Sequence, residues 1–403
     1  MGIFNALLRG VQGGRRANTI SIDSSLGNVL VSGSSKRGKE SVIRNYVVSA
    51  LNAGEGVIIF RDIATGLSSY PLITSSSRIV CEIDCTDNCT TEQVDIFAGM
   101  SEKDINAYVI KIFDMYNEVD KKVKMSYQNY IGLMRDLMKK AGKKFKLDQL
   151  VDYSIEDMED WNFRLCTNQI EQSRNDRFLN SIRADIRELE SYFYDFSQNV
   201  VGYVFSGNKS LDTLLRNKEI IEISLDFSAK PEESQIIMSA IMDAVNRVNL
   251  STAGKSGLRI VADGVPNEIM IGSGLSKLIK GGRNCKVAYA VADIANLAKQ
   301  SNEWIDFAET YFFFRQTSND NKEFCSAMFG EHEVAKQSHT QGTNQGSFWT
   351  RMQGRGDTTH SNTTTTSYQK ERFYPPEQFA SLPENECIFY SKLSGEHTLL
   401  TVF

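Results

Sequence analysis

The sequence contains the stretch NVLVSGSSKRGKES at residues 28–41, which is the most informative segment of the chain. Its first residues form a short, β-branched apolar run that is typical of a buried strand. The pattern G-x-x-x-x-G-K follows from Gly33 to Lys39, directly before apolar residues at helical spacing. A strand, a glycine loop and a helix in this order can bind phosphate. The backbone N–H groups of the loop, the positive end of the helix and the lysine ammonium then all face the anion.

We therefore predict a phosphate-binding loop made of Gly33, Ser34, Ser35, Lys36, Arg37, Gly38, Lys39, Glu40 and Ser41. One position departs from the usual pattern. A Ser or Thr that holds Mg²⁺ normally follows the lysine, and here that residue is Glu40. A carboxylate can also ligate Mg²⁺, but it is longer and brings negative charge toward the phosphates. The alternative interpretation is a plain Gly/Ser turn without a ligand.

Composition indicates a globular protein with a large core. The 403 residues are 41% hydrophobic and 24% charged, and the net charge of −5 argues against a broadly basic nucleic-acid coat protein. No apolar run reaches the roughly 18 residues of a membrane span. Seven cysteines without a C-x-x-C pattern favour reduced thiols in a cytoplasmic protein. We expect the first 16 residues to be a frayed arm.

The chain divides by its patterns into three parts. Residues 1–100 hold the phosphate loop, a helix at 41–53 and the apolar strand 57–60, and we expect them to form the first part of an α/β core. Residues 101–205 carry apolar stripes at helical spacing and predict an all-α insertion. Residues 206–403 return to strands and complete the core. Within them, residues 336–370 are rich in Thr, Ser, Gln and Gly and predict a flexible loop or an exposed hairpin.

A second informative segment ends in an acid. Residues 258–262 are an apolar strand, and Asp263 follows at its carboxyl end. An Asp in this place beside a phosphate loop reaches Mg²⁺, usually through water. The position after it normally holds a glutamate that polarises the attacking water, but this sequence has Gly264 there. The alternative is a strand that runs into a simple Asp-Gly turn.

The order of these segments resembles the FtsK/HerA group of hexameric motor ATPases, and most of all the TraG-like coupling proteins of type IV secretion. The likeness covers nearly the whole length. Beyond the two segments above, it rests on four short stretches, which are DIATG at 62–66, VDIF at 94–97, GRNCKV at 282–287 and YPPEQFASLP at 374–383.

The resemblance implies a RecA-like P-loop NTPase core with a mainly parallel sheet and an inserted all-α domain. It implies ATP and Mg²⁺ as ligands, with Glu40 and Asp263 as the metal-side residues. Arg283 and Arg315 would contact the phosphate of a neighbouring subunit in a hexameric ring. DNA and proteins of the secretion or conjugation machinery are the implied partners, and a membrane would be reached only through a partner.

Several positions depart from the family pattern. Gly264 replaces the catalytic glutamate, Ala292 replaces the sensor glutamine, and Asn296 replaces a second glutamine. Loss of the water-activating carboxylate typically lowers hydrolysis by orders of magnitude. Two functions therefore stay open at this point. The chain is either a divergent ATPase with weakened hydrolysis, or a non-hydrolysing structural or regulatory protein that keeps the motor fold for protein–protein interaction.

Overall fold

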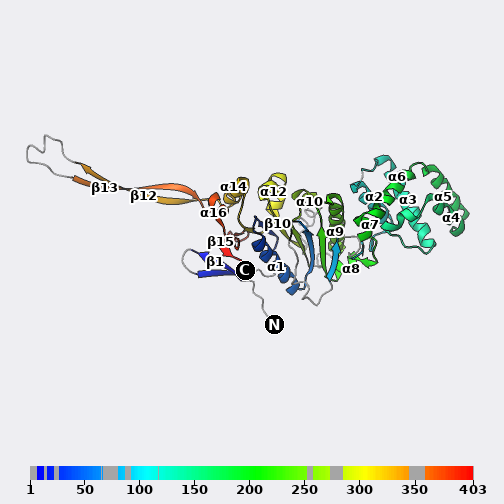
Figure 1. Ribbon diagram of the computed structural model, residues 1–403, viewed down its shortest axis with the longest axis horizontal. Helices are drawn as coiled ribbons and strands as arrows, with labels where there is room; N and C mark the ends of the chain where they lie inside the picture. Colours follow the sequence, from blue (N-terminus) through cyan, green and yellow to red (C-terminus); the bar gives the residue numbers. More distant parts are fainter. Residues whose placement is uncertain are drawn as a thin grey trace, which may run out of the picture. The chain divides into compact units, whose positions relative to one another are not determined.

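A computed structural model of the chain describes residues 7–12, 16–21, 27–64, 66, 80–86, 92–116, 118–251, 257–272, 285–344 and 359–402. The chain forms two compact units. The first consists of Met1–Phe314 with Glu384–Phe403, and the second consists of Arg315–Pro383 (Figure 1).

The first unit is built on a mixed sheet that has 11 strands among the described residues. A parallel part lies at its centre and along one side. In spatial order, its strands are β11 (Thr310–Phe313), β3 (Val29–Ser32), β10 (Cys285–Val291), β9 (Leu258–Asp263), β4 (Gly56–Asp62), β8 (Ile220–Leu225) and β5 (Val80–Asp84). Three of these strands, β3, β9 and β11, are buried along their whole length, as expected for the centre of a sheet with both faces covered. The predicted α/β fold with a mainly parallel sheet is confirmed.

The other side of the sheet is antiparallel. It continues from β11 through β14 (Glu386–Ser391), β15 (His397–Thr401), β1 (Leu7–Gln12) and β2 (Arg16–Ser21). The expectation of a frayed N-terminal arm is therefore wrong for the described residues. Arg9 pairs with Thr401, so the beginning of the chain is held by its far end.

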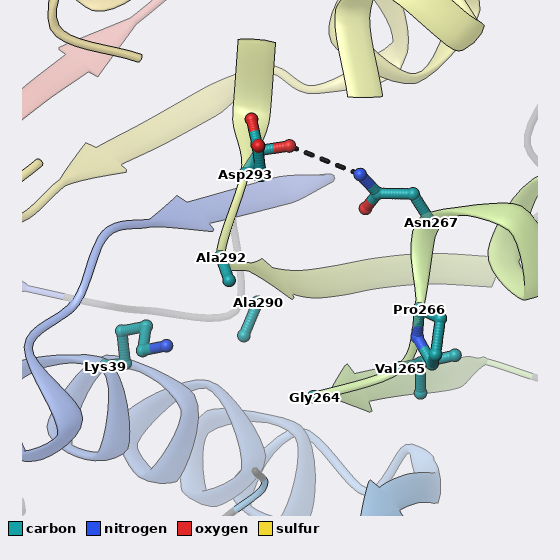
Figure 2. Close-up of a pocket in the computed structure, with 8 residues that line it drawn as sticks. All are labelled: Lys39, Gly264, Val265, Pro266, Asn267, Ala290, Ala292 and Asp293. Atoms are coloured by element: carbon teal, nitrogen blue, oxygen red, sulfur yellow. Dashed lines mark hydrogen bonds between the residues drawn. The ribbon is translucent and has the colours of Figure 1, made fainter. Parts of the chain in front are cut away.

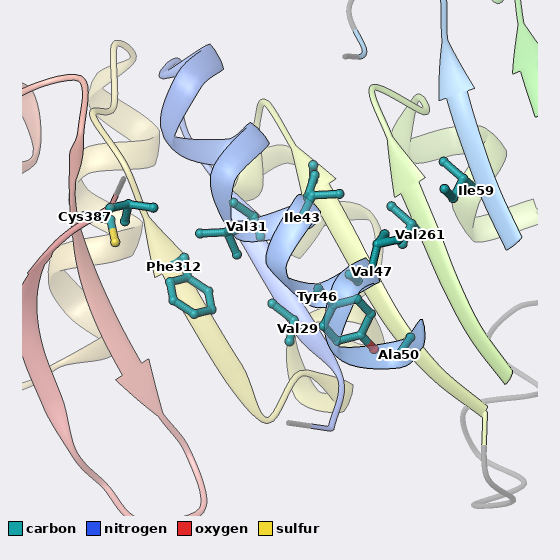
Figure 3. Close-up of a cluster of buried hydrophobic side chains, with 14 of the residues drawn as sticks. Val29, Val31, Ile43, Tyr46, Val47, Ala50, Ile59, Val261, Phe312 and Cys387 are labelled. Atoms are coloured by element: carbon teal, nitrogen blue, oxygen red, sulfur yellow. The ribbon is translucent and has the colours of Figure 1, made fainter. Parts of the chain in front are cut away.

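Helix α1 (Lys36–Asn52) packs on the central strands through its apolar stripe (Figure 3). Val42, Ile43, Tyr46 and Val47 are buried against Val29 and its neighbours in the sheet. A buried cation strengthens the contact at the other end of the helix. Arg259, fully buried in β9, stacks over the Tyr46 ring at 4.6 Å and forms an ion pair with Glu55. The helix after the loop is thus fixed to the strand that ends in Asp263.

Other helices of the first unit flank the strands. They are α8 (Leu211–Arg216), α9 (Pro231–Ser251), α10 (Asn267–Gly272), α12 (Ile294–Gln300) and α13 (Asn302–Phe307). α9 begins with Pro231, as predicted, because proline is tolerated in the first turn of a helix.

Residues 102–204 form a helical segment between two short strands that pair in parallel, β6 (Val94–Asp95) and β7 (Lys209–Ser210). The segment contains α2 (Glu102–Tyr116), α3 (Lys121–Lys140), the 3-10 helix η1 (Leu147–Asp152), α4 (Ile155–Leu165), α5 (Gln169–Ile182), α6 (Ile186–Gln198) and α7 (Val200–Val204). Phe113 lies at its centre, with ring centroids of Tyr192, Phe193 and Phe196 within 5.8 Å. These helices belong to the same compact unit as the sheet, so the predicted boundaries of a separate all-α domain stay a prediction.

Among its described residues, the second unit contains two helices and a long hairpin. The helices are α14 (Asn319–Met328) and α16 (Pro376–Ser381), and the hairpin strands are β12 (Glu331–Asn344) and β13 (Thr359–Arg372). The strands pair in antiparallel register from Glu331 opposite Arg372 to Asn344 opposite Thr359. Of the two expectations for residues 336–370, the flexible loop is wrong for the described part, because that part is paired strand. The tip, 345–358, lies outside the described residues.

Candidate nucleotide-binding site

The predicted loop lies at the carboxyl end of β3, where ligands bind in parallel sheets. Gly33 has φ 127°, a conformation that favours glycine, and it turns the chain out of the strand. α1 begins at Lys36 and not at the predicted residue 41, because Ser35 is an N-cap whose Oγ accepts from the Gly38 N–H at 3.1 Å. The same hydroxyl donates to the carbonyl oxygen of Glu384. The second half of the predicted loop is therefore the first turn of the helix.

Gly38 allows α1 to approach the end of β11. A Cβ at this position would lie 2.1 Å from Cε1 of Phe314, far inside van der Waals contact. The absence of a side chain at Gly38 is thus a packing requirement, and it places the first turn of α1 against the sheet beside the loop.

Lys39 extends from that first turn toward the ends of β9 and β10 (Figure 2). It borders a cavity of about 250 Å³ whose other lining residues are Gly264, Val265, Pro266, Asn267, Ala290, Ala292 and Asp293. Burial lowers the pKa of the Lys39 ammonium, Asp263 acts in the opposite direction, and Lys36 adds to the lowering. A half-buried ammonium group in the first turn of a helix attracts a phosphate group, because its charge adds to the positive end of the helix dipole.

Asp263 ends β9 and is almost completely buried, with 3% of its surface exposed. One strand, β10, separates β9 from β3, and Ala290 of that strand pairs with both Asp263 and Val31. The acid and the loop therefore stand on the same edge of the sheet, one strand apart. Gly264 follows with φ 73°, which turns the chain sharply behind the acid.

The cavity wall opposite Lys39 is mostly apolar, and its polar groups are engaged with each other. The Asn267 amide donates to the carbonyl oxygen of Asp293 at 3.2 Å, and its Oδ1 accepts from the Tyr289 hydroxyl at 2.5 Å. The Asp293 carboxylate caps α12 by accepting from the Asn296 N–H at 2.9 Å. Gly264 and Ala292, the positions of two departures from the family pattern, both lie on this wall.

The sequence did not single out Asn267 and Asp293. The spacing Asp293-x-x-Asn296 after a strand is a helix N-cap signal and locates Asp293 at the end of β10. Nothing comparable marks Asn267, whose place depends on the long-range contact with Tyr289.

The remaining predicted residues have different surroundings. Glu40 forms an ion pair with Arg44 one turn along α1, with 2.5 Å between the charged atoms, and it does not line the cavity. Ser34, Lys36 and Arg37 are exposed on the loop side, and Ser41 is half-buried. Arg315 is exposed and is the first residue of the second unit. Arg283 lies outside the described residues.

The described residues contain no cluster of three or more His, Cys, Asp or Glu side chains placed to hold a metal ion. Their cysteines are all free thiols. A search of the helices in the same part of the chain finds none that is long and apolar enough to span a membrane.

Comparison with known proteins gives a sequence match and a set of structural matches. Residues 281–384 match the family model TraG-D_C, described as the TraM recognition site of TraD and TraG. No curated protein sequence matches the chain.

Among solved structures, the bacterial conjugative coupling protein TrwB, in the form TrwBdeltaN70 with sulphate, is similar at a TM-score of 0.56 and 15% identity, over 98% of this chain and 93% of that one. TrwB in complex with ADP and Mg²⁺ gives a TM-score of 0.55 at 15% identity, with the same coverage. VirB4 of Thermoanaerobacter pseudethanolicus gives 0.53 at 10% identity, over 100% of this chain and 98% of that one.

Identities this low show a shared fold. The predicted resemblance to the TraG-like coupling proteins is confirmed, and the chain has the P-loop NTPase fold of TrwB and VirB4 along nearly its whole length, with a TraG-D_C segment at residues 281–384.

Proposed function

We propose that the chain is the nucleotide-binding domain of a motor protein that resembles the coupling proteins of type IV secretion. We further propose that it binds ATP with Mg²⁺ but hydrolyses the bound ATP only weakly. One observation carries the proposal. Lys39 lies in the first turn of the helix after a glycine loop and faces a cavity at the sheet edge where Asp263 ends its strand. TrwB, which has this fold, has been solved with ADP and Mg²⁺ and with non-hydrolysable GTP and ATP analogues.

The residues present fit a nucleotide phosphate. Lys39 would pair with the terminal phosphates, and the backbone N–H groups of the loop and the first turn would surround them. Ser35 now satisfies one of those N–H groups, that of Gly38, so phosphate would replace the Ser35 hydroxyl as its partner. Asp263 would hold Mg²⁺ through water. Glu40 would join it only after leaving Arg44. Arg283 and Arg315 would complete the site of a neighbouring copy.

The same cavity supports weak hydrolysis. Water attack on a phosphate needs a base or an orienting side chain within hydrogen-bond reach. Two positions on the facing wall, Gly264 and Ala292, carry neither. The Asn267 amide is bonded to the Asp293 carbonyl oxygen and to the Tyr289 hydroxyl. The Asp293 carboxylate also lines this wall, where its bond from the Asn296 N–H holds it as the cap of α12.

The comparisons support the partners that we propose. The TraG-D_C match supports docking to a protein of the relaxosome or secretion machinery through residues 281–384. The shared fold supports DNA as the translocated substrate and a homo-hexameric ring in the cytoplasm that meets the membrane through a partner. The second candidate is a non-hydrolysing structural or regulatory protein. The apolar wall of the cavity is the observation that favours it.

Calorimetric titration of the full chain with a non-hydrolysable ATP analogue and Mg²⁺ tests the proposal. We expect saturable binding that Lys39→Ala weakens at least about tenfold, the usual worth of a charge-assisted hydrogen bond. Lys121→Ala, which removes an exposed lysine at the start of α3, is the matched control and should bind like the wild type. Absence of saturable binding by the wild type at millimolar analogue would refute it, as would equal binding by Lys39→Ala.

A further inference from the structure

The hairpin of the second unit, here called the ribbon, has two open edges. Its strands β12 and β13 are 14 residues each and pair only with one another among the described strands (Figure 1). Every described side chain at 335–342 and 361–370 is exposed. A two-stranded sheet exposed on both faces is marginally stable in water, and each outer edge offers unpaired N–H and C=O groups to another strand. Pairing with a further strand at either edge would therefore stabilise the ribbon.

The outer part of the ribbon lacks the devices that normally protect an edge. Between Gln337 and Asn344 and between Thr359 and Gln369 there is no Lys, Arg, Asp, Glu or Pro. Charges and prolines on edge strands are the usual means of preventing pairing with other chains. Threonine, which fills positions 363–366, has a high preference for strands. This composition favours pairing and does not block it.

The charges at the base of the ribbon argue against nucleic acid as the partner. Glu331, Glu333 and Glu371 balance Lys336, Lys370 and Arg372. A surface that binds a phosphate backbone needs an excess of positive charge, and these residues provide none. The exposed side chains are also too polar for a lipid surface.

The base charges favour a second copy of the same chain. Within the ribbon, Glu331 stands opposite Arg372 and Glu333 opposite Lys370. If two copies are related by rotation so that their ribbons point the same way, β13 of one copy runs antiparallel to β12 of the next. The same register across this contact again places Glu331 opposite Arg372 and Glu333 opposite Lys370, which stabilises the pair of strands. Two β12 strands side by side in parallel would instead place glutamate next to glutamate.

The two faces of the ribbon also suit repetition. One face carries small side chains, with Ser338 opposite Thr365 and Thr340 opposite Thr363. The other carries amide side chains, Gln337, Gln341 and Asn362, together with His339, whose Nδ1 lies 3.1 Å from Thr364 Oγ1. Amide side chains on neighbouring strands form ladders of hydrogen bonds.

We propose that the ribbon is a self-association element, in which β13 of one copy pairs edge to edge with β12 of the next. The contact is heterologous, because two different edges meet, and it can therefore join more than two copies. This inference goes beyond the proposed function and does not depend on nucleotide binding.

Sedimentation velocity of the full chain over a concentration series tests whether the ribbon drives self-association. It is compared with a truncated variant that lacks residues 338–365 and joins Gln337 to Thr366 through an Asn-Gly turn, which suits a tight hairpin. We expect the mass of the wild type to rise with concentration and the truncated variant to stay monomeric. Lys39→Ala should associate like the wild type, so a failure of nucleotide binding is distinguishable from a failure of the ribbon.

A charge exchange tests the register. The double variant Glu333→Lys with Lys370→Glu keeps opposite charges opposite within its own ribbon. It should associate with itself as the wild type does, whereas mixed contacts place like charges together. Co-precipitation of differently tagged chains should recover mixed pairs about threefold less than either like pair. A monomeric wild type, a truncated variant that associates equally, or mixed pairs that form as readily as like pairs would each overturn the proposal.

Discussion

On one side of the cavity, Lys39 extends from the first turn of α1, behind the glycine loop that follows β3. On the other side, Gly264 and Ala292 directly follow β9 and β10. The first side is constrained at several points, by the positive φ of Gly33, by the Ser35 cap and by the packing of Gly38 on Phe314. The second side has an acid at Asp263, but an apolar wall follows it.

Under the proposed function, nucleotide binding and hydrolysis would use different walls of one site. A loop and a lysine can hold a phosphate without any group that activates water. Both walls rest on the same core, because Arg259 of β9 is buried against Tyr46 of α1. The loss of groups on one wall therefore need not disturb the geometry of the other.

The largest effect is expected for Gly38→Ala, which disturbs the packing of α1 on the Lys39 side of the cavity. The new Cβ would overlap the Phe314 ring, so α1 or the end of β11 must shift. We expect the free energy of unfolding to fall by about 2 kcal/mol, typical of overpacking, and analogue binding to be lost. Denaturant unfolding and calorimetry measure the two effects.

Gly272→Ala is the control for this substitution, because its Cβ would meet nothing closer than 3.9 Å. Addition of Phe314→Leu to Gly38→Ala should restore part of the stability. If Gly38→Ala unfolds like the wild type, the close approach of α1 to β11 is not a feature of the protein in solution.

A smaller effect should appear as a pH dependence of the free energy of unfolding and of the affinity for the analogue, both through Lys39. Burial lowers the folded-state pKa of Lys39, so the folded chain loses this proton at lower pH than the unfolded chain, whose lysine pKa is about 10.4. The cost of the buried charge is fully present below the folded-state pKa, and stability rises as pH increases from there toward the unfolded value.

Analogue affinity should fall over the same alkaline range, since the neutral amine no longer pairs with phosphate. Lys39→Arg keeps its charge at high pH and should bind with a flatter profile. Titrations at several pH values between 7 and about 10 compare the two chains. Parallel profiles would show that Lys39 does not carry the interaction.

Sequence reasoning predicted the elements whose signals are local. β9 and α9 were found because an unbroken apolar strand and a proline-led helix are visible in the chain itself. β1 and β2 were missed because β1 pairs with β15, almost 400 residues away, and β2 pairs only with β1 among the described strands. The ribbon was only one of two expectations, since its polar composition also fits a disordered segment.

The site was predicted in part for the same reason. The glycine spacing and the acid that ends β9 point from sequence alone to the loop, Lys39 and Asp263, and their role in nucleotide binding stays a prediction. The start of α1 was placed five residues late, because the cap formed by Ser35 was not recognised and Gly38 was assigned to the loop. The facing wall could not be assembled from sequence, since Asn267 and Asp293 meet only through tertiary structure.

The central claim is that this chain binds nucleotide on one wall and lacks the hydrolytic groups of the other. ATP turnover by the full chain, with and without DNA, tests it most directly. We expect turnover near background for the wild type and a measurable rise for Ala292→Gln, which restores an orienting amide at the end of β10. Gly264→Glu should raise turnover less, because the φ of 73° at position 264 is strained for any residue with a side chain. Robust wild-type turnover that DNA stimulates and Asp263→Ala abolishes would contradict the account.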